Sequence, residues 1–201
     1  MLGGWGTCGS PSLLIEALAR SGVRDLTVIM CGSLAAEPLN EVGAIARLIT
    51  SFGSYAGAAP TPPAFAARLA AGELAVELCS QGVLAERVRA GGAGIPAFYL
   101  EEAMVGRFRS GDEVRDIAGR RCVLETALRA DVALIQASIA DRAGNLSWRD
   151  GERNVNEVMA FAADVVVAEA HDLYEIGWLA PEQVMVPGIV VDRVVQAGEP
   201  P

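Results

Sequence analysis

The chain has 201 residues, of which 52% are hydrophobic, and carries a formal net charge of −9 at pH 7. This length suits one domain with a full-sized core, so we expect residues 1–201 to form a single domain. Charged residues interrupt every apolar run before it reaches the roughly 20 residues that a membrane-spanning helix needs. The acidic balance argues against a nucleic-acid partner, because contacts to phosphates require a basic face.

Residue usage excludes further classes of site. The chain contains no lysine, so neither a Schiff-base lysine nor a P-loop lysine can act from it. The absence of a secretory signal pattern at the N-terminus favours a cytoplasmic location. We expect no metal site and mostly buried thiols, because the cysteines form none of the paired spacings that hold zinc. These cysteines are Cys8, Cys31, Cys79 and Cys122.

Helical and extended patterns alternate along the chain. In order, they predict a helix at 11–20, strands at 26–30 and 48–52, a helix at 63–71, a strand at 74–79, a helix at 83–89, a strand at 132–135, a helix at 154–163, and strands at 165–168 and 189–195. Residues 101–116 indicate an exposed loop or hairpin, and residues 141–145 a tight turn between strands. Continuous apolar strands are typical of a parallel sheet that is covered on both faces. We therefore predict an α/β fold, with an open, largely parallel sheet flanked by helices.

A glycine-rich loop, G-G-W-G-T-C-G-S-P, occupies residues 3–11. Pro11 suits the first turn of a helix, and such loops can bring backbone N–H groups to a ligand. The glycine spacing does not match G-x-G-x-x-G well, and no acidic residue ends a second strand to hold a ribose, which disfavours a dinucleotide. A tight structural turn is the alternative interpretation.

Residues 80–99 carry the strongest signal of a site. Gln81 and Gly82 follow the apolar run 74–79, so we expect a strand to end there and an amide to face a cleft. The helix predicted from residue 83 ends at the G-G-A-G run of residues 91–94, where positive φ and close approach of another backbone cost little. Because ligands of open α/β sheets bind where strands end, this segment is the predicted wall of a pocket.

Other chemically capable residues have structural alternatives that we favour. His171 precedes an aspartate, but the G-x-S-x-G elbow of a Ser-His-Asp hydrolase is absent. Glu101 and Glu102 are adjacent, and adjacent residues of a strand point to opposite faces. Cys31 follows a strand without a neighbouring histidine to activate it. Asn154 is the expected cap of a helix, and a buried capping network is favoured over a substrate contact.

Several long motifs occur in a fixed order. They are G-G-W-G-x-C-G-x-P from residue 3, Q-G-x-L-A-E-R-x-R-A-G-G-A-G-I-P-A-F-Y from residue 81, L-E-T-A-L-R-A-D-V-A-L-I from residue 124, D-R-A-G-N-L from residue 141, R-N-x-N-x-V-M-A from residue 153, V-A-E from residue 167 and P-G-I-x-V from residue 187. Together they resemble the α subunit of the family I CoA-transferases, of the 3-oxoacid type. The resemblance covers nearly the whole chain.

The resemblance implies an open α/β fold and a ping-pong reaction. In that reaction a glutamate carboxylate, supplied by a partner β subunit, attacks an acyl-CoA thioester, passes through an anhydride and becomes a glutamyl-CoA thioester. A second carboxylic acid then takes up the CoA, so coenzyme A is a substrate and no cofactor is implied. Nothing in this chain matches the Ser-Glu-Asn-Gly-like motif of that glutamate, so no catalytic residue is expected here.

The resemblance also implies which residues contact the substrate. Gln81 matches a family glutamine that faces the reacting carbonyl, where a fixed amide donor stabilises negative charge on the thioester oxygen. Three further residues match positions beside the substrate: Gly82, Gly4 and Trp5. A glycine turn at the acyl site and the subunit junction is matched by Gly91, Gly92 and Gly94.

Three departures from the family pattern bear on the substrate and the start of the fold. M-C-G-S-L at 30–34 replaces the usual S-N-N-A-G, which removes two polar substrate contacts. L-E-E-A-M at 100–104 replaces T-P-T-G, and its added negative charge disfavours a short dicarboxylate such as succinate. Only two residues precede the first glycine pair, where the family has a helix and most of a strand. Either the start of the sequence is wrongly placed, or these elements are missing and their apolar neighbours are exposed.

Three functions therefore stay open. The favoured one is the non-nucleophile subunit of a heteromeric acyl-CoA:carboxylate CoA-transferase, assembled as a heterodimer or an α2β2 complex. The second is a hydrolase of a cyclic 3-oxoacyl-CoA on the same scaffold. The third is a non-catalytic structural or ligand-sensing subunit.

Overall fold

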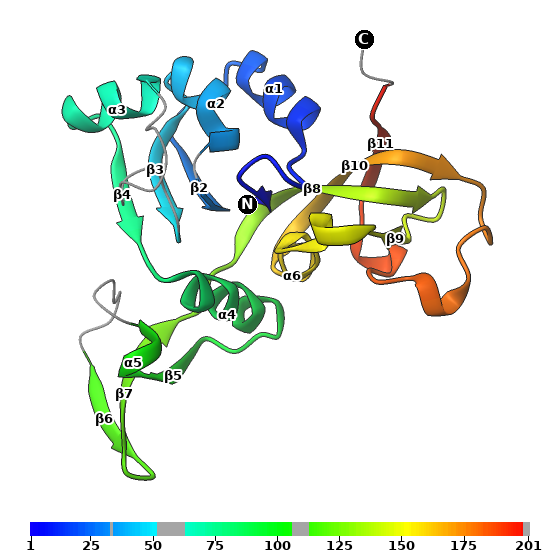
Figure 1. The fold of residues 1–201 in the computed structure, drawn as a ribbon. Helices are drawn as coiled ribbons and strands as arrows, with labels where there is room; N and C mark the ends of the chain where they lie inside the picture. The colour runs from blue at the N-terminus through cyan, green and yellow to red at the C-terminus, as the bar shows by residue number, and fades with distance from the viewer. Residues whose placement is uncertain (33, 52–62, 106–112, 199–201) are drawn as a thin grey trace.

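A computed structural model describes residues 1–32, 34–51, 63–105 and 113–198, and it confirms an open, largely parallel α/β fold (Figure 1). The larger sheet has the strand order β11-β10-β8-β1-β2-β3-β4, and neighbours along this path run parallel. The short strand β9 pairs antiparallel with β8. The strands are β1 (Leu2–Trp5), β2 (Leu26–Cys31), β3 (Ile45–Thr50), β4 (Ala75–Leu78), β8 (Ala130–Asp141), β9 (Leu146–Ser147), β10 (Ala163–Tyr174) and β11 (Arg193–Gln196).

Helices cover both faces of the larger sheet, which explains the apolar strands. On one face lie α1 (Ser12–Arg20), α2 (Glu37–Glu41) and α3 (Pro63–Ala70); on the other lie α4 (Gln81–Gly92) and α6 (Asn156–Phe161) (Figure 1). The first face buries Ile15, Leu39 and Phe65 against the strands. The second buries Val83 and Met159, among others. In β2, for example, Val28 and Ile29 enter different apolar clusters, as expected for a strand covered on both faces.

A smaller antiparallel sheet replaces the loop or hairpin expected at residues 101–116. It consists of β5 (Ala97–Glu101), β7 (Arg120–Thr126) and β6 (Val114–Ile117), with the short helix α5 (Glu102–Val105) beside it. Residues 106–112 of the expected loop lie outside the described residues. The turn between β6 and β7 is Ala118-Gly119, with φ of 51° and 76°. Two-residue hairpin loops need positive φ, and A-G is a weaker sequence signal than N-G or D-G, so the sequence analysis expected a loop or hairpin over 101–116 but did not place this turn.

Helix α4 begins earlier and ends later than predicted. Gln81 and Gly82 do not end a strand; they form its first turn, with Ser80 as the N-cap, whose hydroxyl accepts the N–H of Val83 at 3.4 Å. The predicted turn at Gly91 and Gly92 is wrong as well, because both residues belong to the last turn of the helix. In this run Gly94 has the positive φ, 72°, that a turn requires.

Close packing, not a turn, explains the glycine at position 91. A Cβ placed on Gly91 would lie 2.0 Å from the backbone oxygen of Leu128, whereas a Cβ on Gly82 would meet no atom within 4 Å. We predict that Gly91→Ala lowers the free energy of unfolding by about 1–3 kcal/mol, because backbone must move. The matched Gly82→Ala should raise it by up to about 1 kcal/mol through helix propensity. Urea unfolding measures the change in stability of both variants. Equal changes would mean that close packing against Leu128 does not require a glycine at position 91.

Other predicted boundaries also shift. Asn154 does not cap the start of α6, where Val155 holds that position; with φ of 24° it instead ends the short 3₁₀ helix Asp150–Arg153. The strand expected at 189–195 begins only at Arg193, because Gly188–Val190 forms a short 3₁₀ turn. His171 lies exposed within β10 and not after a strand. The predicted tight turn at residues 141–145 is confirmed: the Asp141 carboxylate accepts the backbone N–H groups of Ala143 and Asn145 at 3.0 Å.

Strand β1 is shorter than its neighbours β2 and β8. Leu2 pairs with Met30 on one side and with Leu134 on the other. An apolar cavity of about 310 Å³ lies beside Met1, lined by residues near the starts of β2 and β8 such as Leu26 and Val132. Whether a family helix and strand are missing, and whether the chain is one domain, stay predictions.

Candidate active site

The predicted site residues follow the carboxyl ends of parallel strands. Trp5 ends β1, Cys31 ends β2, and Gln81 comes three residues after the end of β4. Chain order in the sheet reverses at β1, which lies between β2 and β8. In open α/β sheets the crevice at such a reversal, outside the carboxyl ends, is where ligands bind. This topology places the end of β1, with Gly4 and Trp5, at the reversal, and Gln81 at the edge of the sheet.

A row of contacts links these strand ends. Trp5 pairs with Cys31 across the sheet, and the Cys31 sulfur lies 3.1 Å from the Ser51 hydroxyl. The Thr50 hydroxyl accepts the Gly32 N–H at 3.1 Å, and the Thr50 carbonyl accepts the Cys79 N–H at 3.1 Å. The carboxyl edge is therefore a continuous bonded surface from β1 to β4.

The predicted residues occupy separate points along this edge. Gln81 and Gly82 are both exposed in the first turn of α4. Gly4 is buried, and Trp5 is half exposed. Three strand spacings separate β1 from β4, which is about 14 Å. Gly91 lies at the far end of α4, about 15 Å from Gln81 at 1.5 Å per residue. An extended ligand could contact Gln81 and Trp5 at two different groups, whereas one acyl carbonyl cannot touch Gln81 and Gly91 together.

The glycine-rich loop closes on a buried asparagine. The Asn156 side chain accepts the Gln136 N–H at 3.0 Å and donates to the carbonyls of Gly9 and Glu152, both at 2.9 Å. Asn156 is fully buried, and a Cβ on Gly3 would lie 1.8 Å from its Oδ1. This segment forms a buried polar network as expected, but Asn156 within α6 is at its centre and Asn154 does not cap the helix; the network holds Gly9 of the loop beside α6.

Two of the four cysteine thiols are not activated, because they are buried. Cys31 and Cys79 are buried, and burial raises the pKa of both thiols, to about 11 for Cys79. Such thiols stay protonated at neutral pH, as a structural role requires. Cys122 is buried too, whereas Cys8 is exposed, so the prediction of buried thiols holds for three of the four. Beside His171, the Asp172 carboxylate accepts a hydrogen bond from Arg149 at 2.9 Å.

The acidic loop residues at the expected acyl pocket are paired with arginines. Arg120 forms an ion pair with Glu101, and Arg121 lies 2.8 Å from Glu102. These pairs are partly exposed, and each offsets the negative charge that distinguishes this segment from the family pattern. The charge argument against a dicarboxylate substrate is therefore weaker than the sequence suggested.

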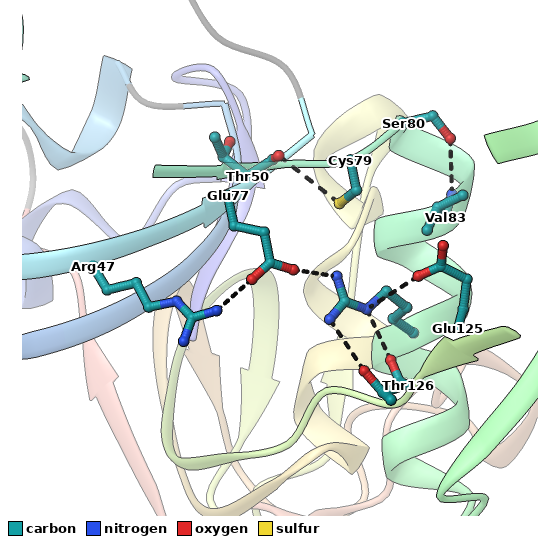
Figure 2. A network of polar contacts seen from close by, with 9 residues as sticks. Arg47, Thr50, Glu77, Cys79, Ser80, Val83, Glu125 and Thr126 are labelled. Carbon is teal, nitrogen blue, oxygen red and sulfur yellow. Dashed lines mark hydrogen bonds and ion pairs between the residues drawn. The ribbon is translucent and has the colours of Figure 1, made fainter. Parts of the chain in front are cut away.

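A buried arginine at the base of the site was missed by the sequence analysis. Arg87 projects from α4 and donates to the Glu77 carboxylate at 2.7 Å and to the Thr126 carbonyl at 2.8 Å (Figure 2). Arg47 donates to the same carboxylate at 2.5 Å. Burial by itself would raise the pKa of Glu77, but the two guanidinium groups hold it below its usual value of 4.5. One signal was available: A-E-R-V-R places Arg87 on the face of α4 that carries Val83 and Leu84, where an unpaired charge is not tolerated.

A buried carboxylate, Glu169 of β10, joins the larger sheet to α1. Glu169 accepts the Leu14 N–H at 3.0 Å. Burial raises the pKa of Glu169 above its usual value of 4.5, against the opposing effect of the Leu14 N–H. A carboxyl with a raised folded pKa holds its proton more tightly in the folded state, so stability falls as the pH rises from 4.5 through that pKa.

We predict that Glu169→Gln removes this pH dependence. The glutamine keeps an oxygen that accepts the Leu14 N–H but carries no charge to desolvate. The stability of the wild type minus that of the variant should fall as the pH rises from 4.5 to neutrality, with urea unfolding measured at each pH. Taking the difference cancels the titration of the other carboxylates, and a difference that grows with pH would contradict the assignment.

Comparison with known proteins decides the family. The model of the family described as "Coenzyme A transferase" matches residues 1–197. This chain belongs to the coenzyme A transferase family. The family assignment made from the motifs is thereby confirmed.

Known members of the CoA-transferase family are similar to the chain over nearly its whole length. It is 44% identical to the A subunit of succinyl-CoA:3-ketoacid coenzyme A transferase of Xanthomonas campestris pv. campestris (strain B100), over 99% of this chain and 81% of that protein. It is 40% identical to the A subunit of 3-oxoadipate CoA-transferase of Pseudomonas putida, over 97% of this chain and 84% of that protein. A crystal structure of a variant of the decarboxylase AibA/AibB matches with a TM-score of 0.81 and 30% identity, covering 97% of this chain and 75% of that one. The fold therefore serves more than one reaction.

Within the described part of this CoA-transferase chain, no helix is long and apolar enough to cross a membrane.

Proposed function

We propose that this chain is the non-nucleophile subunit of a heteromeric acyl-CoA:carboxylate CoA-transferase of the 3-oxoacid type. A β subunit supplies the glutamate that attacks the thioester and carries the CoA. Coenzyme A is a substrate, and no cofactor takes part. The similarity to the A subunits of two such enzymes supports the proposal.

One observation carries the role of this chain: the exposed Gln81 amide stands at the N-terminal end of α4, at the carboxyl edge of the sheet. An amide N–H donates without losing a proton, so it stabilises negative charge without taking part in acid–base chemistry. The N-terminus of the helix adds a partial positive charge at the same place. Both features suit an oxygen that becomes negative when the partner's carboxylate attacks the thioester.

In the proposed reaction each step exchanges one bond for another. The partner's carboxylate oxygen bonds to the acyl carbon, and the carbon–sulfur bond breaks to release CoA thiolate and leave a mixed anhydride. The thiolate then attacks the glutamyl carbon of the anhydride, and the bond from this carbon to the bridging oxygen breaks to release the first acid as its carboxylate. The second acid repeats these steps in reverse. At each attack, Gln81 donates to the oxygen that gains charge.

Co-expression with the β-type partner from the same source tests the proposal. The two chains should co-purify, and the complex should move CoA from acyl-CoA to a free carboxylate. CoA release in the absence of an acceptor acid would favour the hydrolase, and acyl-CoA binding without turnover the non-catalytic role. The mass of the complex distinguishes a heterodimer from an α2β2 assembly. The cytoplasmic location stays a prediction.

We predict that Gln81→Ala lowers kcat about 10²-fold, or about 3 kcal/mol in activation free energy, because one positioned donor is typically worth that much. The complex should still assemble, since Gln81 is exposed and buries no apolar surface. Steady-state kinetics of the co-purified complex measure the effect. Glu86→Ala on the same helix serves as the control and should leave kcat within about twofold. An unchanged rate in Gln81→Ala would remove this residue from the mechanism.

A further inference from the structure

The position of α4 depends on a polar junction with Arg87 at its centre. The Arg87 side chain is 5% exposed and bonds to Glu77 of the larger sheet and to Thr126 of the smaller sheet, both labelled in Figure 2. On the side of the larger sheet it donates through Nη1 to Glu77 of β4. On the side of the smaller sheet, Nε donates to the Thr126 carbonyl of β7 and lies 3.9 Å from the fully buried Glu125 carboxylate.

The junction extends beyond this single pair. Arg47 of β3 binds the second oxygen of Glu77, so this carboxylate is held from two directions. The Arg87 carbonyl accepts the N–H of Leu128 at 2.8 Å, which ties the backbone of α4 to the segment after β7. Arg87 of α4 is thus bonded directly to β4 and to the smaller sheet. Through Glu77 and Arg47 it is also linked to β3.

Gln81 lies six residues before Arg87 on the same helix, a distance of about 9 Å along its axis. The helix is continuous from Gln81 to Gly92, so a rotation or shift at Arg87 is transmitted to its first turn. Ser80 provides a second attachment, because its hydroxyl donates to the Met104 carbonyl at 3.0 Å. The Ser80 bond attaches the start of α4 to α5, beside the smaller sheet. The bond from Arg87 to Glu77 fixes the position of α4 against β4.

We propose that Arg87 is a positioning residue for the transfer reaction: through its bonds to Glu77 and Thr126 it fixes α4 so that the Gln81 amide meets the reacting carbonyl. This inference rests on the proposed function of Gln81. Arg87 is buried and does not touch substrate, so it acts only through the helix. A misplacement of a catalytic group by about 1 Å is enough to slow a reaction considerably.

The geometry requires an arginine and not simply a positive charge. Nε and Nη1 point in different directions within one rigid plane, and they reach Thr126 and Glu77 at the same time. A lysine ammonium is a single point on a flexible stem and cannot hold both groups in that orientation. Arg87→Lys keeps the charge beside the glutamates, so the protein should fold, but it loses the fork that sets the angle of α4.

A double-mutant cycle in the complex with the β-type partner tests the inference. Arg87→Lys should lower kcat about tenfold with KM within about twofold, because positioning acts at the chemical step. In the Gln81→Ala background the same change should lower kcat less than about twofold, since the group to be positioned is gone. Equal effects in both backgrounds, or no effect in the wild type, would overturn the proposal. Arg89→Lys, an exposed arginine of the same helix, is the control.

Hydrogen–deuterium exchange of the chain gives a readout that does not depend on activity. Arg87→Lys should speed exchange of the α4 backbone amides at least about fivefold relative to those of α1, because a loosened helix opens more often. Unchanged exchange in α4 would overturn the positioning role. Failure of CoA transfer by the wild-type complex would instead contradict the proposed function, and the exchange result would still report whether Arg87 fixes the helix.

Discussion

Replacing Arg87 with methionine should lower the free energy of unfolding by about 3–5 kcal/mol, the range observed when one partner of a buried ion pair is removed. Methionine fills a similar volume, so packing is largely preserved and the loss is electrostatic. Glu77 would keep only Arg47, the fully buried Glu125 would lose the guanidinium 3.9 Å away, and the Thr126 carbonyl would lose its donor. Urea unfolding at neutral pH, with the slope of the transition compared between variants, measures the difference.

The matched control is Arg89→Met, two positions further along the same helix. The Arg89 side chain is 52% exposed and pairs with Glu86 at 2.8 Å, so its removal should change stability by less than about 1 kcal/mol. If both variants lost the same free energy of unfolding, the buried bonds of Arg87 would add no stability beyond that of an exposed ion pair.

The pH dependence of the Arg87→Met effect has a definite sign. The pKa of Glu77 is held below 4.5 in the folded protein, and the arginine charges and hydrogen bonds that lower it outweigh burial, which raises it. The stability that comes from this pairing is present above pH 4.5 and is lost as the pH falls through the lowered pKa. The difference between the wild type and Arg87→Met should therefore shrink in acid.

Replacing Asn156 with alanine should lower the free energy of unfolding by roughly 3–5 kcal/mol. Three buried or half-buried backbone groups would lose their bonds: the Gln136 N–H and the carbonyls of Gly9 and Glu152. Each such group costs about 1–3 kcal/mol when it is left unsatisfied. Thermal or urea unfolding measures the loss, which should also loosen the glycine loop at the sheet reversal.

Glu157→Gln is the control for this prediction, because it lies at the next position of α6. Its carboxylate forms a partly exposed pair with Arg153, so the change should alter stability by less than about 1 kcal/mol. Asn156→Asp is the stricter variant: it retains an acceptor for the Gln136 N–H but places its second carboxylate oxygen, in place of Nδ2, against the carbonyls of Gly9 and Glu152, which need a donor. If Asn156→Asp were as stable as the wild type, the assigned hydrogen-bond directions would be wrong.

The alternating pattern of the chain predicted most of the larger sheet. Runs such as 26–30, 74–79 and 165–168 were recognisable because a strand covered on both faces must be apolar along its length. The smaller sheet was missed, since β7 has buried Val123 and Cys122 between charged residues and its stability comes from α4 and α5 packing against one face. A local sequence pattern cannot predict this packing, because α4 and α5 lie in other segments of the chain.

The candidate site was predictable in part. Gln81 was singled out from its place after a strand, and it does lie at the carboxyl edge of the sheet. The predicted turn at Gly91 and Gly92 failed, because glycine has two uses with one sequence signature: positive φ and close approach of backbones. Here the second applies, and the Leu128 carbonyl that requires it is distant in sequence.

By itself, the sequence determined the layered α/β architecture, the family and the absence of a nucleophilic glutamate motif, because hydrophobic period and ordered motifs are properties of the chain alone. Tertiary structure decided that β1 lies where the strand order reverses, that Asn156 closes the glycine loop, and that Arg87 joins the two sheets beneath Gln81. The physical reason is common to all three. A buried polar group is stable only when partners from distant segments satisfy it, and those partners come together only when the chain has folded.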